Sequence, residues 1–319
     1  MSVELSVVVP VYNEQESVPE LYRRLKPVLT AAVGSHEIVF VDDGSRDRSW
    51  ELIRELAAQD GSVRGVRFSR NFGHQMAFAA GLRHTVGDAV VIMDADLQDP
   101  PELIPQLLAR WRDGFDVVYA VRTKREGETI FKRVSAATFY RVLRAITQVD
   151  IPVDTGDFRL MSRKAVDAFN ALEERHRFTR GLVTWLGFRQ VGVPYQRAAR
   201  HAGESKYPLR KMWRLATDGI TSFSSLPLHL AGWFGGVVSA LGFVGFVAAL
   251  LARVAGRGIP LTALLVLALV FLGGVQLVCL GFLGAYLGRV HEEAKRRPLY
   301  LVQESVGLGE AQGAATTRA

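Results

Sequence analysis

Residues Val91–Asp99 read VIMDADLQD, an apolar segment that ends in a run of carboxylates. The apolar residues predict a buried strand over 89–94, and the acids Asp94, Asp96 and Asp99 gather at its carboxyl end. Acids are poor packing residues, because burying an unpaired charge is costly. Ligands of an open α/β sheet bind at the carboxyl ends of its strands, where oxygen ligands suit Mg²⁺ or Mn²⁺ on a diphosphate. Taken alone, an Asp-x-Asp also fits an ordinary solvated turn.

Strand and helix patterns alternate on both sides of this segment. We expect further strands over 5–11, 37–42, 63–68 and 117–121. We expect helices over 14–32, from Ser49 onward and over 75–85. Strands that alternate with helices predict an α/β fold with a mostly parallel sheet covered on both faces.

The C-terminal third of the chain has a different character. Segments 226–251 and 260–287 are apolar and each exceeds the about 20 residues that span a bilayer. Lys and Arg on both outer flanks predict that both ends lie in the cytoplasm. Segment 207–225 carries Trp and basic residues beside one apolar helical face, as in helices that lie on a membrane, although an ordinary packed helix is the alternative.

These patterns divide the chain into four parts. They are a catalytic domain (1–206), a juxtamembrane amphipathic helix (207–225), two transmembrane helices (226–288) and a cytoplasmic tail (289–319). We expect the tail to be disordered after about Gln303 because it is rich in Gly, Ala and Thr. We expect no signal peptide, because Met1 leads directly into the first strand.

The composition limits the classes of molecule that the protein is expected to bind. The 319 residues hold 39 Lys and Arg against 32 Asp and Glu, a formal net charge of +7. Such a balance fits nucleic acid, anionic lipid or phosphate-bearing substrates. Nucleic acid is disfavoured because no helix-turn-helix or base-stacking motif is present. The single cysteine, Cys279, excludes a disulfide within the chain.

Four further polar motifs accompany the Asp-x-Asp. They are VPVYNE (9–14), VDDGS (41–45), SRNFGHQ (69–75) and DTGDFR (154–159). Each of the first two, alone, is a generic loop or helix cap. Together, at the carboxyl ends of predicted strands, the motifs define one crevice rich in acids and turns.

These residues closely resemble family 2 glycosyltransferases with the GT-A fold, over about residues 4–210. Segments RNFGHQ (70–75), DADLQDPPE (94–102) and GESKY (203–207) are similar to the polyprenyl-phosphate glycosyltransferases, which include dolichyl-phosphate mannose synthase and bacterial undecaprenyl-phosphate glycosyltransferases. The resemblance implies an inverting, metal-dependent hexosyltransferase. It would move a sugar from a nucleotide-sugar, with UDP-glucose as first choice, to undecaprenyl phosphate on the cytoplasmic face of the bacterial inner membrane.

The resemblance also assigns roles by position. The nucleotide-sugar would be bound by Pro10, Tyr12, Glu14, Asp42, Asp43, Asp94, Ala95, Arg200 and Lys206. The cation, Mg²⁺ or Mn²⁺, would be bound by Asp94, Asp96 and Gln98. The lipid phosphate would be bound by Arg122, Arg133 and Ser135. Asp157 would be a base or a group that positions the acceptor. A strong base is less necessary here, because a phosphate monoester with a second pKa of about 6 is already largely dianionic.

The sequence is compatible with several alternatives. GDP-mannose, UDP-N-acetylglucosamine or a UDP-aminoarabinose could serve as donor to the same acceptor. A processive polysaccharide synthase is disfavoured because segment 106–111 does not match the Gln-x-x-Arg-Trp spacing and two spans leave little for a channel. The intact acidic set argues against a non-catalytic membrane scaffold or flippase. The Gly-rich apolar helices favour a homo-oligomer, with a tetramer as one candidate.

Overall fold

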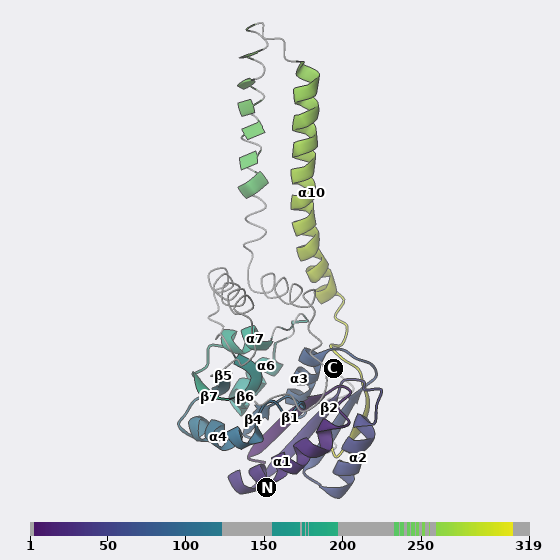
Figure 1. Cartoon of the computed structure of the whole chain (residues 1–319), viewed down its shortest axis with the longest axis vertical. Helices are drawn as coiled ribbons and strands as arrows, with labels where there is room; N and C mark the ends of the chain where they lie inside the picture. Colours follow the sequence, from purple (N-terminus) through teal and green to yellow (C-terminus); the bar gives the residue numbers. More distant parts are fainter. Residues whose placement is uncertain are drawn as a thin grey trace.

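The computed structural model describes residues 3–122, 155–172, 174–175, 177, 179–196 and 260–308, with scattered positions between 233 and 255. Its strands are β1 (Leu5–Val11), β2 (His36–Asp42), β3 (Val63–Phe68), β4 (Ala89–Ile92), β5 (Val117–Arg122), β6 (Thr155–Ser162), β7 (Gln190–Tyr195) and β8 (Val302–Val306). Its helices are α1 (Ser17–Ala32), α2 (Ser49–Gln59), α3 (His74–Arg83), the short 3-10 helix η1 (Pro101–Leu103), α4 (Ile104–Arg112), α6 (Arg163–Asn170), α7 (Thr179–Trp185) and α10 (Leu261–Ala294). Figure 1 shows α10 rising from one end of the domain that contains the sheet.

The strands form one eight-stranded sheet in the order β7-β5-β6-β4-β1-β2-β3-β8. β4, β1, β2 and β3 are mutually parallel, and so are β5 and β7. β6 runs antiparallel between β4 and β5, and β8 runs antiparallel along β3. The predicted GT-A-like α/β fold with a mostly parallel sheet is therefore confirmed, while β6, β7 and β8 were not predicted.

Alternate residues of the strands pack on opposite faces of the sheet, as the period of two requires. One core lies under α1, α2 and α4 and includes Leu25, Trp50 and Leu107. On the other face α3, α6 and α7 enclose a second core around Phe78 and Phe169. The helices on both faces leave the carboxyl ends of the parallel strands as the place where polar loops gather.

The central strand tolerates a proline near its end. β1 pairs with β4 only from Leu5 to Val8, and Pro10 comes two residues after the last of these pairs. Proline lacks an N–H, so its place past the ladder costs no hydrogen bond on that side. The polar motifs follow at once, as β1 ends at Val11 and β2 at Asp42.

The apolar C-terminal part is only partly described. Among the described residues one helix, Phe271–Ala294 within α10, is long and apolar enough to cross a membrane. Its surface carries exposed apolar side chains such as Leu277 and Leu287. The described positions between 233 and 252 are helical. Two membrane spans, the 207–225 interfacial helix and the homo-oligomer stay predictions, and segment 207–225 lies outside the described residues.

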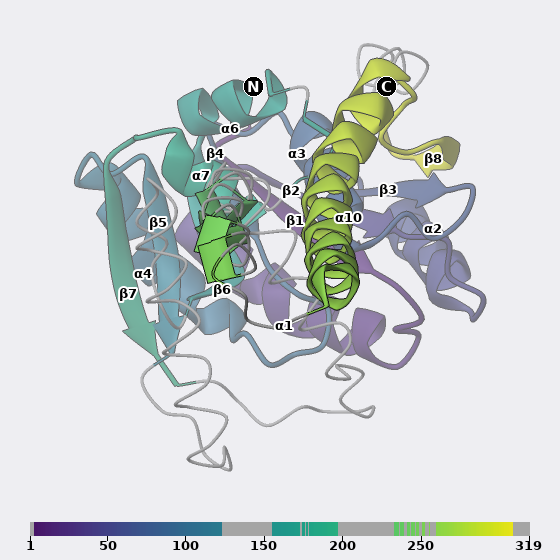
Figure 2. The same cartoon turned by 90° about the horizontal axis from the view of Figure 1, so that it is seen from above.

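The chain returns to the sheet after α10, which corrects our expectation for the tail. β8 pairs with β3, and Tyr300 is buried with its ring stacked on Phe68 at 4.8 Å between centroids. Glu304 accepts a hydrogen bond from Trp50 Nε1 at 2.9 Å. The prediction of disorder after Gln303 is therefore wrong for residues 304–306, because they belong to β8 and pair with β3. Figure 2 shows β8 beside β3, next to the C-terminal end of α10.

Candidate active site

The loops after β1 and β2 are fastened to each other. The N–H of Asn13 donates to Ser45 Oγ and the N–H of Glu14 donates to Ser49 Oγ, both at 2.9 Å. Asn13 adopts a left-handed φ of 55°, which asparagine tolerates better than most residues. The turn leaves the Tyr12 side chain 40% exposed at the rim, where its ring is available to a ligand.

Asp42 and Asp43 lie beneath these loops. Asp42 is completely buried, accepts the N–H of Ser45 at 3.1 Å and pairs with Arg67 at 3.3 Å. Burial raises the pKa of Asp42, and the Ser45 hydrogen bonds and Arg67 oppose that rise. The guanidinium of Arg67 also lies over the ring of Trp50 at 5.9 Å. The end of β2 is therefore held from β3 and α2 together.

Asp43 anchors the SRNFGHQ loop. Its carboxylate accepts the N–H of Phe72 at 2.7 Å and the N–H of Gly73 at 3.0 Å. Burial raises the pKa of Asp43 to about 6, against these two hydrogen bonds. Gly44, at a φ of 69°, packs so closely that a Cβ there would lie 2.5 Å from the carbonyl carbon of Arg70. The second and third motifs thus form one unit, and nucleotide binding by Asp43 stays a prediction.

The Asp-x-Asp loop follows β4, which ends at Ile92 rather than at the predicted Asp94. The loop turns at Leu97, whose φ is 61°, and the N–H of Gln98 donates to Asp96 Oδ1 at 3.2 Å. Among the described residues no group of three or more His, Cys, Asp or Glu side chains is gathered for a metal. Mg²⁺ usually takes one or two carboxylates plus substrate phosphates, so the oxygen donors of Asp94, Asp96 and Gln98 fit such an ion.

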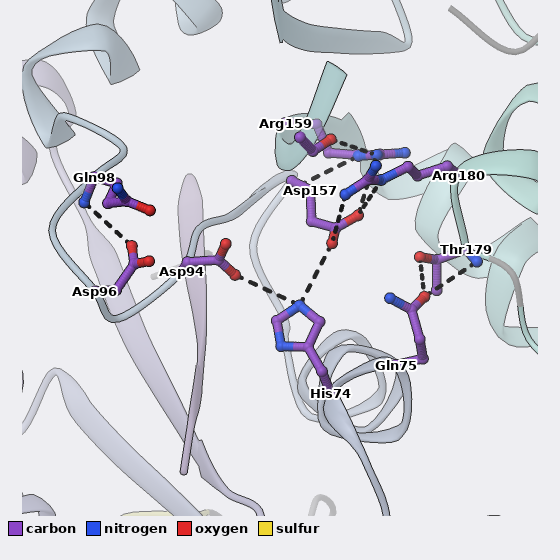
Figure 3. Close-up of polar contacts among 10 residues, drawn as sticks. His74, Gln75, Asp94, Asp96, Gln98, Asp157, Arg159, Thr179 and Arg180 are labelled. Carbon is purple, nitrogen blue, oxygen red and sulfur yellow. Dashed lines mark hydrogen bonds and ion pairs between the residues drawn. The ribbon is translucent and has the colours of Figure 1, made fainter. Parts of the chain in front are cut away.

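A mixed cluster of charges lies beside this loop (Figure 3). His74 Nε2 stands 3.5 Å from Asp94 Oδ1 and 3.5 Å from Asp157 Oδ2, so it lies between the two acids. Arg180 donates through Nε to Asp157 Oδ1 at 3.0 Å and through Nη2 to Oδ2 at 3.3 Å. Arg159 Nη2 lies 3.7 Å from the same carboxylate. Asp157 is therefore surrounded by three basic side chains.

These contacts set the charges of the cluster. Burial would raise the pKa of Asp157, but Arg180 and then His74 outweigh it and hold this pKa well below the usual range. Desolvation would lower the pKa of His74, yet the hydrogen bond to Asp157 and the charges of Asp94 and Asp157 raise it to about 9. At neutral pH the cluster therefore contains a carboxylate of very low basicity and an imidazolium.

Helix α3 also holds the helix that supplies Arg180. Gln75 Oε1 accepts the N–H of Thr179 at 3.2 Å and the Thr179 hydroxyl as well. Thr179 begins α7 and precedes Arg180 directly. Because His74 and Gln75 are adjacent, one turn of α3 contacts both Asp157 and the helix that carries its main partner.

Arg122 is the described member of the predicted lipid-phosphate set. It ends β5, and its Nε donates to the hydroxyl of Tyr195 at 3.4 Å. Among the predicted site residues Arg133, Ser135, Arg200 and Lys206 lie outside the described residues. The remaining predicted residues are gathered at one end of the sheet, from the loops after β1, β2 and β4 and from the ends of β5 and β6.

Sequence reasoning missed Arg180 and included His74 only as part of the SRNFGHQ motif. Arg180 lies on a short helix that follows β6 in the chain by many residues and carries no local motif. The sequence feature that could have indicated this cluster is the polar pair His74-Gln75 at the start of a helix, because polar side chains near other site loops need hydrogen-bond partners. The positions of those partners required the folded chain.

Comparison with known proteins gives the chain its relatives. Residues 6–169 match the model of glycosyl transferase family 2. The "uncharacterized glycosyltransferase YkcC" of Bacillus subtilis is 50% identical over 96% of this chain and 95% of its own length. The "SfII prophage-derived bactoprenol glucosyl transferase" of Shigella flexneri is 41% identical over 95% of this chain and 98% of its own. A "prophage bactoprenol glucosyl transferase homolog" of Escherichia coli is 40% identical over 94% and 98%.

A solved structure of glucosyl-3-phosphoglycerate synthase from Mycobacterium tuberculosis has a TM-score of 0.48 and 20% identity, over 69% of this chain and 76% of that one. That likeness is too distant for inferences about ligands. The family match and the identities over nearly the whole chain are sufficient without it: the chain belongs to glycosyl transferase family 2.

Proposed function

We propose that this protein transfers glucose from UDP-glucose to undecaprenyl phosphate at the cytoplasmic face of the membrane, with inversion at the anomeric carbon. The observation that carries the proposal is the pairing of an acidic loop, at Asp94 and Asp96, with a basic cluster around Asp157 at one end of the sheet. Two anionic reactants must meet there. The acidic loop could hold a divalent cation for one of them, and the basic cluster offers cationic side chains to the other.

The sugar and lipid are supported by the relatives. Two full-length relatives at 40–41% identity carry the name bactoprenol glucosyl transferase, which names a polyprenyl lipid and glucose. GDP-mannose or another UDP-sugar is the alternative donor. Tyr12, exposed at the rim above Asp42, is placed where a nucleotide base could stack on it.

In the reaction, a phosphate oxygen of the lipid forms a bond to the anomeric carbon. The bond from that carbon to the diphosphate oxygen breaks, and UDP leaves with the electron pair. Asp94, Asp96 and Gln98 would hold a divalent cation, which when bound supplies positive charge against the leaving diphosphate. The acceptor approaches from the opposite side of the sugar and brings its own negative charge.

Asp157 acts in this proposal as a positioning residue rather than as a base. Its pKa lies well below the usual range, so it is a poor acceptor for a proton. Its carboxylate instead fixes the directions of Arg180 and His74, so that two cationic side chains have set positions beside the place proposed for the acceptor phosphate. A dianionic phosphate has little need of a base, so a fixed basic cluster is the larger contribution.

The membrane helix is tied to this cluster through the chain before α7. The N–H of Arg175 donates to Glu293 Oε1 at 2.8 Å, and the Arg175 guanidinium donates to the carbonyl of Arg297. Both partners lie at the C-terminal end of α10 and just beyond it. An acceptor with an undecaprenyl tail cannot leave the bilayer, so a site fixed at the base of a membrane helix suits it.

A transfer assay tests the proposal. The purified chain in detergent is given undecaprenyl phosphate, Mg²⁺ or Mn²⁺, and labelled UDP- and GDP-sugars in parallel. We expect a chloroform-soluble glucose product from UDP-glucose that is lost with EDTA. Asp96→Asn should lower the rate by at least about tenfold, and the matched surface variant Asp113→Asn should not.

Other outcomes of this assay select the alternatives. A product from another sugar nucleotide replaces the donor and keeps the acceptor. A long polymer would indicate a processive synthase. Full activity of the Asp96→Asn variant, or no lipid-linked product from any donor, would refute the proposal.

A further inference from the structure

Arg122 lies close to Asp157 but pairs with a neutral group. β5 and β6 are neighbours in the sheet, and the Arg122 guanidinium lies against Gly156, the residue before Asp157. Arg159 and Arg180 pair with the Asp157 carboxylate. Among the described residues, the polar partner of Arg122 is the hydroxyl of Tyr195. Because Tyr195 is neutral, this contact does not offset the positive charge of Arg122.

Tyr195 is placed next to Arg122 by the sheet itself. β5 and β7 are parallel and Arg122 is in register with Tyr195, so the two side chains share one face. The Tyr195 ring is 5% exposed and meets Phe158 edge-on at 6.1 Å between centroids. The ring therefore has a fixed position, and its hydroxyl oxygen is a fixed acceptor for Arg122 Nε.

Asp99 fixes the direction of that hydroxyl. The Tyr195 hydroxyl donates to Asp99 Oδ1 at 2.5 Å, and Asp99 is completely buried. Since the hydroxyl proton points at Asp99, the oxygen presents its lone pairs to the guanidinium. Burial and the charge of Asp99 raise the pKa of Tyr195, so the hydroxyl keeps its proton at any working pH.

Gly156 leaves the space that Arg122 occupies. A Cβ at this position would lie 2.7 Å from Arg122 Nη2, which is closer than real contacts allow. The guanidinium is the far end of a flexible side chain, so an alanine there would displace Arg122 rather than the backbone. The glycine and the tyrosine thus restrict the same guanidinium from two sides.

The two hydrogen bonds that link Asp99, Tyr195 and Arg122 begin at the Asp-x-Asp loop, which contains Asp99. Asp96 and Gln98 flank the turn at Leu97, and Asp99 follows Gln98 directly. One short loop therefore carries two predicted ligands of the metal ion on the donor diphosphate, Asp96 and Gln98, and also Asp99, which orients the tyrosine that contacts Arg122. A shift of this loop would move both.

We infer that Tyr195, oriented by Asp99, and Gly156 are positioning residues that hold Arg122 toward the phosphate of the acceptor. The inference rests on the proposed function, because it takes undecaprenyl phosphate as the anion that meets Arg122. It adds two residues with no direct contact to substrate, and a physical link between the donor loop and the acceptor arginine.

The test measures KM separately for undecaprenyl phosphate and for UDP-glucose in the full-length chain in detergent. Tyr195→Phe keeps the ring and removes one hydrogen bond, so we expect the KM for the lipid to rise about fivefold. Gly156→Ala should raise it at least as much. The KM for UDP-glucose should change by less than about twofold in both variants. Binding of undecaprenyl phosphate without donor, followed by tryptophan fluorescence, should weaken by the same factors.

Two controls separate positioning from lost stability. Tyr22→Phe removes a similar tyrosine–aspartate hydrogen bond, to Asp60 at 2.8 Å, on α1. Gly34→Ala adds a methyl group where nothing lies within 4 Å. Both should leave the lipid KM unchanged, whatever they do to the melting temperature.

The outcomes distinguish this inference from the proposed function. If the wild-type chain transfers glucose to the lipid but Tyr195→Phe and Gly156→Ala keep its KM, the inference is wrong and the function stands. If the wild-type chain binds the lipid without transferring any sugar, the proposed function fails and the binding measurements alone decide the inference. If the wild-type chain does not bind the lipid, both are refuted.

Discussion

The Asp157–Arg180 pair can be tested by a double-mutant cycle on stability. Asp157→Asn removes a carboxylate whose side chain is 8% exposed and leaves Arg159, 5% exposed, without its charge partner. Breaking a buried pair on one side costs about 3–5 kcal/mol. Arg180→Gln should cost less, about 1–2 kcal/mol, because Arg180 is 28% exposed and Asp157 keeps His74 and Arg159. We expect the double variant to be more stable than the sum of the two losses predicts.

The expected coupling energy is about 1.5–3 kcal/mol, because two charge-assisted hydrogen bonds of 3.0 and 3.3 Å are lost once rather than twice. Chemical denaturation of the detergent-solubilised chain, followed by tryptophan fluorescence and by circular dichroism, gives the four free energies of unfolding. Coincident transitions by the two signals are needed before the free energies are compared.

The exposed pair Arg110–Asp113 serves as the matched control. Its atoms are 3.4 Å apart and its side chains are 56% and 57% exposed, so its coupling should be below about 0.5 kcal/mol. Coupling of Asp157 and Arg180 at that same low level would show that the buried pair does not form in solution. The positioning role of Asp157 would then have no basis.

Three further perturbations follow from the structure. Burial lowers the pKa of His84 to about 4, so between pH 6.5 and pH 4 the unfolded chain binds a proton that the folded chain does not. The free energy of unfolding should therefore be highest above pH 6.5 and fall by about 3 kcal/mol more in the wild-type chain than in His84→Gln as the pH drops to 4. Denaturation midpoints at both pH values measure this difference. Asp43→Ala leaves two loop N–H groups without their acceptor and should weaken UDP binding by about fivefold or more in calorimetry, whereas unchanged binding would make the loop anchor irrelevant to the donor site. Gly81→Ala places a Cβ 2.1 Å from a Val8 methyl group and should cost about 1–3 kcal/mol, while Gly34→Ala, with open space around it, is the control that should not.

The sequence predicted the parts of the fold that depend on local pattern. β1, β2 and β3 are apolar runs between turn residues, and their predicted bounds agree with the structure within a residue. β6 escaped prediction because its eight residues include Asp157 and Arg159, so the run is not apolar. β8, with the sequence VQESV, resembles a polar tail until β3 supplies its hydrogen-bond partners. The pairing of two strands that are distant in the sequence cannot be predicted from either strand alone.

The same division holds for the site. The acids and turn residues at strand ends were predictable, because parallel strands bring their carboxyl ends to one edge. The contacts that fix them were not, since Arg180 reaches Asp157 from a helix held by Gln75 and Arg122 is supported by Tyr195 across two strands. Binding roles of the predicted residues stay predictions until ligands are measured.

β8 also determines how safely this protein can be shortened. The outer edge of β3 is occupied by β8, an antiparallel strand of 5 residues that returns after α10. A chain truncated at residue 298 would leave the N–H and C=O groups of β3 open, and an open strand edge pairs readily with another molecule. Truncation should therefore lead to strand pairing between molecules and to aggregation. By covering the edge of β3, the few residues after α10 prevent this pairing between copies of the protein.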